Sequence, residues 1–537
     1  MPGPYPVCPC DGSPALAPTT DALRRHPLRA LLVLALLLGF AFQGTRGLWE
    51  PDEGRYTNVA LQMLHSGDYA TLRRNEDSLH FTKPPLTYWA IAASVSAFGR
   101  NEWAVRAPNA LAYVLTVLLV FRLGRHFLPS RPWLPALVYA TSPIPFLATN
   151  TINTDTMLAA METLAVACWA QHRFGGGSVR WLDAMWAAFG LAFLTKGPPS
   201  LLPLLAIFVF CAGEGRALRL LARPLGLLAF LLVGLGWYAL VVRLHPGLLD
   251  YFLGHEVYAR IATPEHNRFP QWWGPLAVYL PTVVLGTLPW LWLAWRRRGD
   301  ATGAGNAAGW RGWREWPAER RFLWCWLLLP VLVFCLARSR LPLYLLPSFV
   351  PLSLLLARAL GTLPFRAGTI ALLAGFVLAL LGIKYYAAAQ FPTDKDVRAF
   401  AARLEPMLPG HPEHLLFVDD MARNGLNLHF DSDVRRLSFE PEPKALSDSS
   451  YDETVAQALA RPERGRVFVM KSAAEARFLA EAARAGRRPL LLGTLPESHG
   501  RVRFEGLKPV YHVRTKPNRR VYTLAGDFPV PGPVRRD

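Results

Sequence analysis

Long apolar runs separated by short basic loops constrain this chain more than any other feature. Runs long enough to cross a bilayer recur from Leu28 to about Tyr386, whereas roughly the last 150 residues resemble a water-soluble domain. With 52% apolar and only 18% charged residues, the chain is typical of a polytopic membrane protein. We predict about eleven spans, at residues 28–44, 105–125, 133–150, 157–172, 181–194, 199–212, 222–243, 275–295, 322–337, 343–360 and 366–387.

The distribution of Lys and Arg predicts the orientation, because short cytoplasmic loops carry an excess of both. Alternate loops are rich in them, and these loops lie at residues 121–131, 172–180, 214–223 and 295–321. An odd number of spans then places the C-terminal tail outside the cytoplasm. We predict a cytoplasmic tail (1–27), a membrane domain (28–387) and a periplasmic α/β domain (388–537).

The net charge of +19 follows largely from this topology, so it does not indicate a nucleic-acid partner. The six Cys residues all lie in the N-terminal tail or in predicted spans. A disulfide scaffold is therefore not expected, and Cys8 and Cys10 lack the further ligands of a zinc site.

A second set of charged residues falls on the outer side, where the rule for basic loops does not explain it. Each residue alone could be a lipid anchor or a solvated surface charge. Because they come from several loops on one face, we predict that they form a binding site. The set comprises Asp52, Glu53, Arg55, Lys83, Asp155, Lys196, His255, Glu256, Arg260, His266, Arg268, Arg338 and Arg340.

The stretch "WEPDEGRY" (49–56) predicts a short surface helix that runs from Pro51 to Ser66–Gly67. Asp52, Arg55 and Tyr56 share one helical face, and Glu53 points about 100° away. An acid and a base could therefore contact one ligand. The alternative is that the acid only caps the helix and pairs with Arg55.

Two lysines precede prolines that can begin helices. Lys83 lies in "HFTKPPLTYW", whose helix should run to about Phe98, and Lys196 lies in "LTKGPP". An ammonium group beside a helix N-terminus favours an anion, which suggests phosphate recognition. Snorkelling of each lysine to the membrane surface is the alternative. Asp155 lies in a bend between two spans.

Several motifs, in this order, resemble the lipid A aminoarabinose transferases and the related protein O-mannosyltransferases. The motifs are "PDEGRY", "GDYATLRRN", "FTKPPLTYW", "GRNEWAVRAPNAL", "LTKGP", "HEVYARI", "HNRFPQWW" and "SRLPLYLLP". The resemblance covers about the first 390 residues and implies a GT-C-like fold of about 11–13 transmembrane helices. It also implies an outward-facing cavity and a soluble outer domain.

The resemblance assigns Asp52 as the catalytic acidic residue and places Arg55, Lys83 and Tyr344 at the donor phosphate. Thr82 departs from the family, since many members carry an acid there, so a divalent metal stays an open question. The reaction itself requires no cofactor. The remaining candidates for substrate binding are Glu53, Tyr56, Asp155, Lys196, His255, Glu256, Arg268 and Arg340.

The predicted function is transfer of a sugar from a polyprenyl-phosphate donor, most plausibly aminoarabinose to lipid A, with inversion implied by the resemblance. Alternatives are an enzyme like the protein O-mannosyltransferases or, from another class, a transporter. A transporter would place its charges near the midplane and usually has symmetric halves. We expect a monomer in the bacterial inner membrane, and expect Asp52→Asn to remove transfer while Glu53→Gln is milder.

The tail after residue 388 predicts a small α/β domain. Strands are expected at 414–420, 466–471 and 488–495, with an amphipathic helix at 472–486. No nucleophile motif or His/Cys cluster occurs in it. We expect a structural role, either covering the cavity or helping to hold an acceptor.

Overall fold

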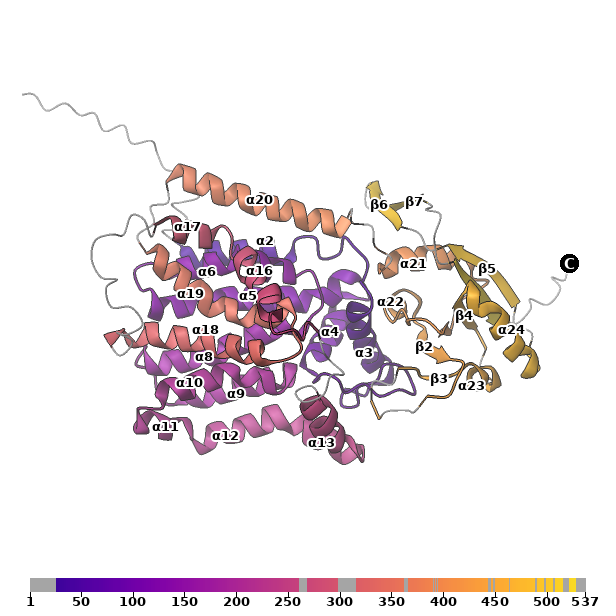
Figure 1. Ribbon diagram of the computed structural model, residues 1–537, viewed down its shortest axis with the longest axis horizontal. Helices are drawn as coiled ribbons and strands as arrows, with labels where there is room; N and C mark the ends of the chain where they lie inside the picture. Colours follow the sequence, from indigo (N-terminus) through magenta and orange to yellow (C-terminus); the bar gives the residue numbers. More distant parts are fainter. Residues whose placement is uncertain are drawn as a thin grey trace, which may run out of the picture.

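The computed structural model describes most of the chain and shows a helical bundle joined to a smaller α/β domain (Figure 1). The described residues are 26–259, 268–297, 315–361, 366–389, 391, 393, 395–442, 446–447, 450–462, 464–487, 490–496, 499–505, 508–514 and 521–527. Cys8, Cys10, Arg260 and His266 lie outside them, as does nearly all of the predicted cytoplasmic tail.

Helices occupy all eleven predicted spans. The elements of the bundle are α2 (Pro27–Phe40), α3 (Asp52–Ser66), α4 (Leu86–Phe98), α5 (Glu102–Phe127), α6 (Trp133–Ala140), α7 (Pro143–Ala148), α8 (Thr154–Arg173), α9 (Arg180–Lys196), η1 (Pro198–Leu201), α10 (Leu202–Cys211), α11 (Gly215–Leu221), α12 (Pro224–Phe230), η2 (Leu231–Leu235), α13 (Gly236–Leu244), α14 (Leu248–Asp250), η3 (Tyr251–Ala259), α16 (Gly274–Gly286), α17 (Trp290–Arg297), α18 (Ala318–Leu336), η6 (Pro342–Ser348), α19 (Phe349–Leu360) and α20 (Ala367–Ala389).

Proline interrupts two of the predicted spans. Pro143 holds Ser142 in an extended conformation, with ψ of 130°, so the span at 133–150 is divided into α6 and α7. Pro289 lies in the break between α16 and α17, whose axes bend by 81°. By length and composition alone, four described helices could cross a membrane, or five if this bent pair is one span.

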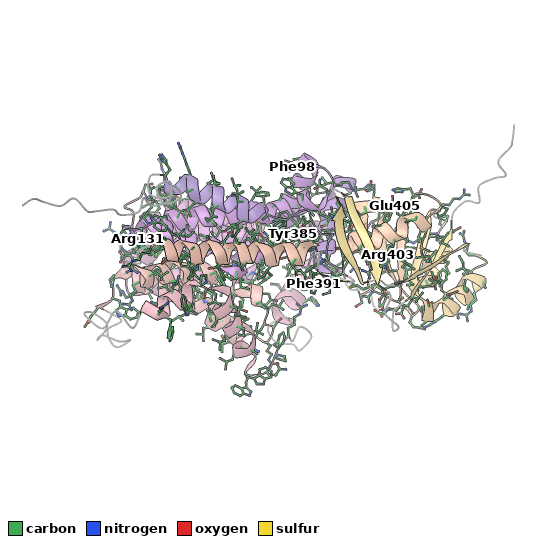
Figure 2. All side chains as sticks on the ribbon, turned by 90° about the horizontal axis from the view of Figure 1, so that it is seen from above. Phe98, Arg131, Tyr385, Phe391, Arg403 and Glu405 are labelled. Carbon is green, nitrogen blue, oxygen red and sulfur yellow. The ribbon has the colours of Figure 1, made fainter. Side chains whose placement is uncertain are left out.

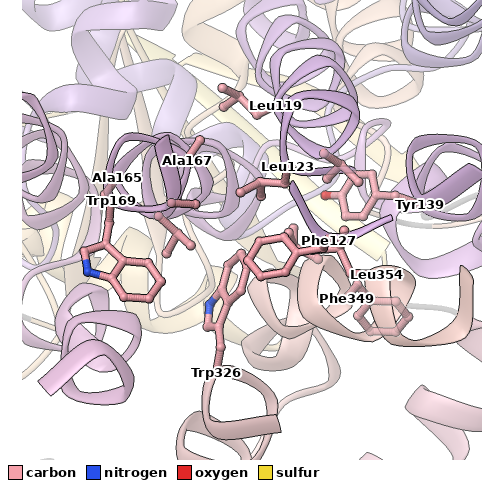
Figure 3. Packing of buried hydrophobic residues seen from close by; sticks show 14 of the residues in the cluster. Leu119, Leu123, Phe127, Tyr139, Ala165, Ala167, Trp169, Trp326, Phe349 and Leu354 are labelled. Atoms are coloured by element: carbon pink, nitrogen blue, oxygen red, sulfur yellow. The ribbon is translucent and has the colours of Figure 1, made fainter. Parts of the chain in front are cut away.

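Buried aromatic side chains hold the bundle together. Trp169 of α8 lies 4.2 Å from Phe322 of α18, measured between ring centroids. Figure 3 shows Trp169, Trp326 and Phe127 in the same cluster of buried residues. On the outside of the bundle, α20 has only 11% of its apolar window buried, which is the exposure expected of a helix that faces lipid.

The tail forms the predicted α/β domain. Its elements are α21 (Val397–Leu404), η7 (Glu405–Met407), β1 (His414–Val418), α22 (Leu426–Phe430), β2 (Asp433–Ser438), β3 (Glu453–Thr454), α23 (Val455–Ala460), β4 (Arg466–Lys471), η8 (Ser472–Ala474), α24 (Glu475–Arg484), β5 (Leu490–Pro496), β6 (His499–Glu505), β7 (Lys508–Arg514) and β8 (Val521–Asp527). The six-stranded sheet has the order β3-β2-β1-β4-β8-β5, and β6 pairs with β7. Strands β1 to β4 are parallel, whereas β8 is antiparallel to both neighbours.

The predicted strands and helix are confirmed as β1, β4, β5 and α24. Strands β2, β3, β6, β7 and β8 were not predicted from the sequence. Strand β2 has no apolar run, because Asp433, Arg435 and Arg436 leave only Val434 and Leu437 apolar. The guanidinium Nε of Arg435 donates to Asp433 at 2.6 Å. This internal ion pair allows a polar strand to be buried in the sheet.

The two domains share one hydrophobic core. Tyr56, Val59 and Tyr88 of the bundle are buried in the same cluster as Phe400 and Leu426 of the tail. Figure 2 labels Tyr385 and Phe391 at this junction and Arg131 at the far end of the bundle. Helix α11 of the predicted basic loop 214–223 and Arg131 of the loop 121–131 therefore lie at the opposite end of the molecule from the tail domain (Figures 1 and 2).

Candidate active site

Helix α3 positions the residues of the opening motif. It begins at Asp52 and ends at Ser66, followed by Gly67 with φ of 70°, as the sequence predicts. Asp52 is the more exposed of its ion pair, with 67% of its side chain accessible against 30% for Arg55. The Arg55 guanidinium donates to Asp52 Oδ1 at 2.7 Å. The motif thus presents an accessible carboxylate held beside a cation.

Tyr56 lies on the same face, one helical turn after Asp52, and is buried. Burial raises the pKa of Tyr56 to about 12; the nearby charge of Arg55 opposes this rise, and the carboxylates of Asp52 and Asp155 add to it. Its ring lies 5.5 Å from that of Tyr88, at the start of α4. The predicted shared face is confirmed, and Asp155 of α8 lies near it.

Asp155 connects this face to a second group of predicted residues. It forms an ion pair with Lys196 at the end of α9, and the Lys196 ammonium lies 4.5 Å from the centre of the Tyr344 ring of η6. These three side chains line one small pocket. Residues far apart in the sequence therefore form one continuous polar region between α3 and η6.

Glu162 lines the same pocket and was missed by the sequence analysis. It lies seven residues after Asp155 on α8, so both point from the same helical face. A buried acid inside an otherwise apolar span is itself an indication of a functional site, and this spacing could have identified it.

Lys83 lies in the loop before α4, as predicted, and is partly buried. Its neighbour Thr82 forms a 2.9 Å hydrogen bond between its hydroxyl and Nε2 of His80. Phe81 packs against Phe252 with ring centroids 6.3 Å apart, which places η3 beside this loop. The lysine is therefore carried by a loop that is packed on both sides.

His255 and Glu256 lie on η3, and both contact Tyr251 of the same helix. The hydroxyl of Tyr251 donates to Glu256 at 3.2 Å, and its ring stacks on His255 at 5.2 Å. They do not line the pocket that contains Asp155, Lys196 and Tyr344. The structure places them beside the Lys83 loop rather than in the centre of the site.

Arg340 has a structural role in this conformation. Its side chain is buried and donates to the backbone oxygens of Phe269, Gln271 and Cys335. Its own backbone N–H donates to the Arg268 carbonyl at 3.0 Å. Arg340 thus holds the turn that carries Arg268, whose side chain is exposed.

Glu53 is the buried centre of a polar network. Its carboxylate accepts hydrogen bonds from Arg46, Arg106 and the backbone N–H groups of Trp49 and Ile152, over distances of 2.5 to 3.1 Å. Burial opposes ionisation, but the charges of Arg106 and Arg46 lower the pKa of Glu53 to about 2. Its oxygens are occupied by protein donors, so the network assigns Glu53 to the fold and not to the substrate.

This position changes the expectation for Glu53→Gln. The sequence analysis is right that Glu53 points away from Asp52, but the residue is buried beside two guanidinium groups and is not a peripheral part of the site. Neutralising it would leave both cations without their counter-charge. A mild effect is therefore no longer expected.

Comparisons with known proteins give a consistent result. A family model described as dolichyl-phosphate-mannose-protein mannosyltransferase matches residues 82–241. The chain is 32% identical over 375 residues to undecaprenyl phosphate-alpha-4-amino-4-deoxy-L-arabinose arabinosyl transferase 2 of Pseudomonas fluorescens strain Pf0-1, covering 67% of this chain and 64% of that relative. It is 31% identical over 416 residues to arabinosyl transferase 1 of a second Pseudomonas fluorescens strain, covering 74% and 69%.

The fold is shared along nearly the whole chain. The crystal structure of ArnT from Cupriavidus metallidurans bound to undecaprenyl phosphate matches with a TM-score of 0.70 at 20% identity, covering 93% of this chain and 97% of that one. The apo structure of the same protein gives a TM-score of 0.68. The GT-C-like architecture with a C-terminal α/β domain is thereby confirmed.

The sequence alignments extend over about two thirds of the relatives' length, from 64% to 69% in these two cases. The motifs quoted from the sequence fall largely within the membrane domain, where the polar region lies. The chain is a multi-pass membrane protein that belongs to the lipid A aminoarabinose transferase family of GT-C glycosyltransferases.

Proposed function

We propose that this protein transfers 4-amino-4-deoxy-L-arabinose from its undecaprenyl phosphate carrier to lipid A. The observation that carries the proposal is the polar region in which Arg55 holds Asp52, the neighbouring Tyr56 lies near Asp155, and Asp155 pairs with Lys196. Relatives at 31–33% identity are named for this donor. The acceptor and the exact sugar follow from the family and stay part of the proposal.

The chemistry needs a group that stabilises the leaving phosphate. Cleavage of the bond between the anomeric carbon and the donor oxygen leaves negative charge on undecaprenyl phosphate, while an acceptor oxygen forms the new bond from the opposite face. We assign Arg55 and Lys83 to that charge, with Tyr344 as a further contact. In a partly dehydrated site their charge counts for more than it does in water.

Asp52 would act on the acceptor. A hydroxyl acceptor would give its proton to the exposed carboxylate, which Arg55 holds in place. A phosphate acceptor on lipid A is already anionic, and Asp52 would then position the sugar. In both cases the Asp52 side chain needs to reach a ligand, and its exposure permits this.

We propose that the site faces the periplasm from the bacterial inner membrane. Support comes from the basic loops, which lie at the end away from the tail domain, while α3 packs against that domain (Figures 1 and 2). We also propose that the protein acts as a monomer. Light scattering of the detergent complex, corrected for bound detergent, should give the mass of one chain.

We propose further that transfer requires no cofactor. Thr82 bonds to His80 and offers no carboxylate, and among the described residues no group of three or more His, Cys, Asp or Glu could hold a metal. Transfer should therefore continue at an unchanged rate in excess EDTA. A loss that Zn²⁺ or Mn²⁺ reverses would contradict this part of the proposal.

The direct experiment uses detergent-purified protein, lipid A and undecaprenyl phosphate-aminoarabinose, without a membrane potential. Release of undecaprenyl phosphate and a mass gain of one aminoarabinosyl group on lipid A are expected. Asp52→Asn serves as the inactive control. Release only when a hexose-charged carrier is supplied would favour a related transferase, and no consumption of any donor would favour transport.

A further inference from the structure

A second pocket lies at the end of the bundle away from the tail domain. It has a volume of about 230 Å³ and is formed where α8 and α10 end and where α9 and α11 begin. In Figure 1, α11 lies at this far end. Arg173, which lines the pocket, is 18 residues after Asp155 on α8, a separation of about 27 Å along the helix. The pocket is therefore separate from the candidate active site.

One wall of the pocket is apolar. Trp169 lies at its inner side and belongs to the bundle core (Figure 3). Leu182, Leu220 and Leu221 complete this wall. The backbone oxygen of Leu221 accepts a hydrogen bond from Trp186 at 2.8 Å, which fixes α11 against α9. Such a surface suits the glycerol and first methylene groups of a lipid better than it suits a fully hydrated ion.

The pocket also has a cationic lining. Arg173 uses one terminal nitrogen to contact both oxygens of Glu214, at 2.9 and 3.2 Å. Its side chain is 32% exposed. Arg216 also lines the pocket and is exposed. The pocket therefore offers two guanidinium groups to an anion.

Further basic residues surround the pocket. Arg180 and Arg219 are exposed on the adjoining helices, and Arg223 pairs with Asp183 at 2.9 Å. Around the opening, cations thus outnumber acids, which raises the local concentration of anions. Basic pockets between membrane helices are suited to anionic lipid headgroups.

We propose that this pocket binds the phosphodiester headgroup of an anionic phospholipid from the leaflet opposite the candidate active site. The phosphate oxygens would accept hydrogen bonds from the guanidinium groups of Arg173 and Arg216, and the glycerol would lie on Leu220 and Leu221. The proposal does not depend on the transferase activity, because no residue of the polar region takes part.

The test is native mass spectrometry of the full-length protein after delipidation, with phosphatidylglycerol or phosphatidylcholine of equal chain length added. One phosphatidylglycerol should be retained at least about tenfold better than phosphatidylcholine. The double variant Arg173→Gln/Arg216→Gln should lose this preference. Equal retention of both lipids by the parent protein would overturn the proposal.

Two further variants distinguish the pocket from the general charge of this end. Arg219→Gln is the matched control, because Arg219 is exposed on the same helix but does not line the pocket; it should retain the lipid like the parent protein. Ala217→Trp keeps both arginines and fills the pocket, so it should lose retention. Undiminished retention in Ala217→Trp, or equal loss in Arg219→Gln, would show binding by the surface field and would overturn the site.

A final arm separates a lipid from a free phosphate. Millimolar inorganic phosphate should not displace phosphatidylglycerol, because it gains nothing from the leucine wall. Displacement by inorganic phosphate at such concentrations would mean that the pocket is a site for a soluble anion, and the lipid assignment would be wrong. A folding control for each variant is its melting temperature relative to the parent protein.

Discussion

At the scale of single residues, two adjacent acids have opposite environments. The Asp52 side chain is 67% exposed, whereas that of Glu53 is 4% exposed between Arg46 and Arg106. Helical geometry predicts that they point in different directions. It cannot predict the burial of Glu53, because Arg106 is 53 residues away and Ile152 is 99 residues away. Only the packing of α5 and α8 around α3 creates that network.

We expect Asp52→Asn to fold like the parent protein and to lower release of undecaprenyl phosphate by roughly 10²–10⁴-fold, the usual range for a group that transfers a proton or orients the reacting atoms. Asn keeps the size of Asp, and α3 has no side-chain capping hydrogen bond to lose, so the melting temperature should stay the same. Full activity in a correctly folded Asp52→Asn protein would reduce the motif to an ion pair.

For Glu53→Gln we expect a loss of about 3–5 kcal/mol in the free energy of unfolding, because two buried guanidinium groups lose their counter-charge. Yield and melting temperature in detergent should fall, with Asp52→Asn as the control from the same turn of helix. A Glu53→Gln protein that melts like the parent protein would show that the network does not support the fold.

Replacing Lys83 by Ala should remove about 2 kcal/mol or more of transition-state stabilisation, which is the cost of losing one charge-stabilising donor. The rate of transfer should fall accordingly. Turnover of the undecaprenyl phosphate sugar measures it, and thermal melting provides the control. Turnover within a factor of two of the parent protein would exclude the phosphate role.

At the scale of elements, the start of α3 is held by the tail domain. Glu50 precedes the helix, is buried, and accepts a 2.6 Å hydrogen bond from the backbone N–H of Gly425, just before α22. Burial raises the pKa of Glu50 to about 8, although that hydrogen bond and the charge of Arg423 oppose the rise. The second oxygen has no partner among the described residues, which suits a protonated carboxyl group.

This pKa predicts a dependence of stability on pH. The folded protein keeps a proton on Glu50 that the unfolded chain releases above about pH 4.5. Between pH 4.5 and about 8, this group should therefore lower the free energy of unfolding by up to about 1.4 kcal/mol for each pH unit. Below that window the effect is absent, and above it the loss is complete.

Glu50→Gln should remove this contribution, because the amide resembles the protonated acid. Melting temperatures measured at pH 5, 6.5 and 8 should decline less in Glu50→Gln than in the parent protein. Glu405→Gln is the matched control, because Glu405 is an exposed acid of the tail domain. Parallel declines in all three proteins would mean that Glu50 does not titrate in this window.

Much at this scale could be predicted from local pattern. The end of α3 follows from Gly67, the start of α4 follows from Pro85 just before it, and strand β4 follows from a run of apolar residues. The strands β2 and β8 could not be predicted in this way. The burial of β2 depends on partners such as Glu453, which contacts Arg435 at 3.2 Å from a later strand.

At the scale of the whole molecule, the charge pattern of the sequence distinguishes the two ends of the molecule. Helix α11 and Arg131 lie at one end, and the tail domain lies at the other (Figures 1 and 2). The same count predicted a group of outer residues, of which Asp155 and Lys196 line one pocket together with Tyr344, which the family resemblance assigned. It could not separate these from Arg340 and Glu53, since charge alone does not reveal which groups are bonded within the protein.

A reporter enzyme that is active only in the cytoplasm, fused after Asp537, should therefore be silent. The same reporter fused within the basic loop after α17 should be active and serves as the control. Activity at Asp537 would reverse the orientation and remove the shared-face argument for the site.

The contact between the segment before α3 and the entry to the tail domain has a consequence for exchanging parts between relatives. Trp49 pairs with Asp396 as an antiparallel bridge, and the Asp396 carboxylate accepts a hydrogen bond from the Gly47 N–H at 3.2 Å. A Cβ atom at Gly47 would collide with that carboxylate, so the two segments must match in side chains. A chimera that takes its tail from another family member joins two halves of this bridge from different parents. Such hybrids should work only when residues 47–50 and 395–398 come from the same parent, whichever protein supplies the rest.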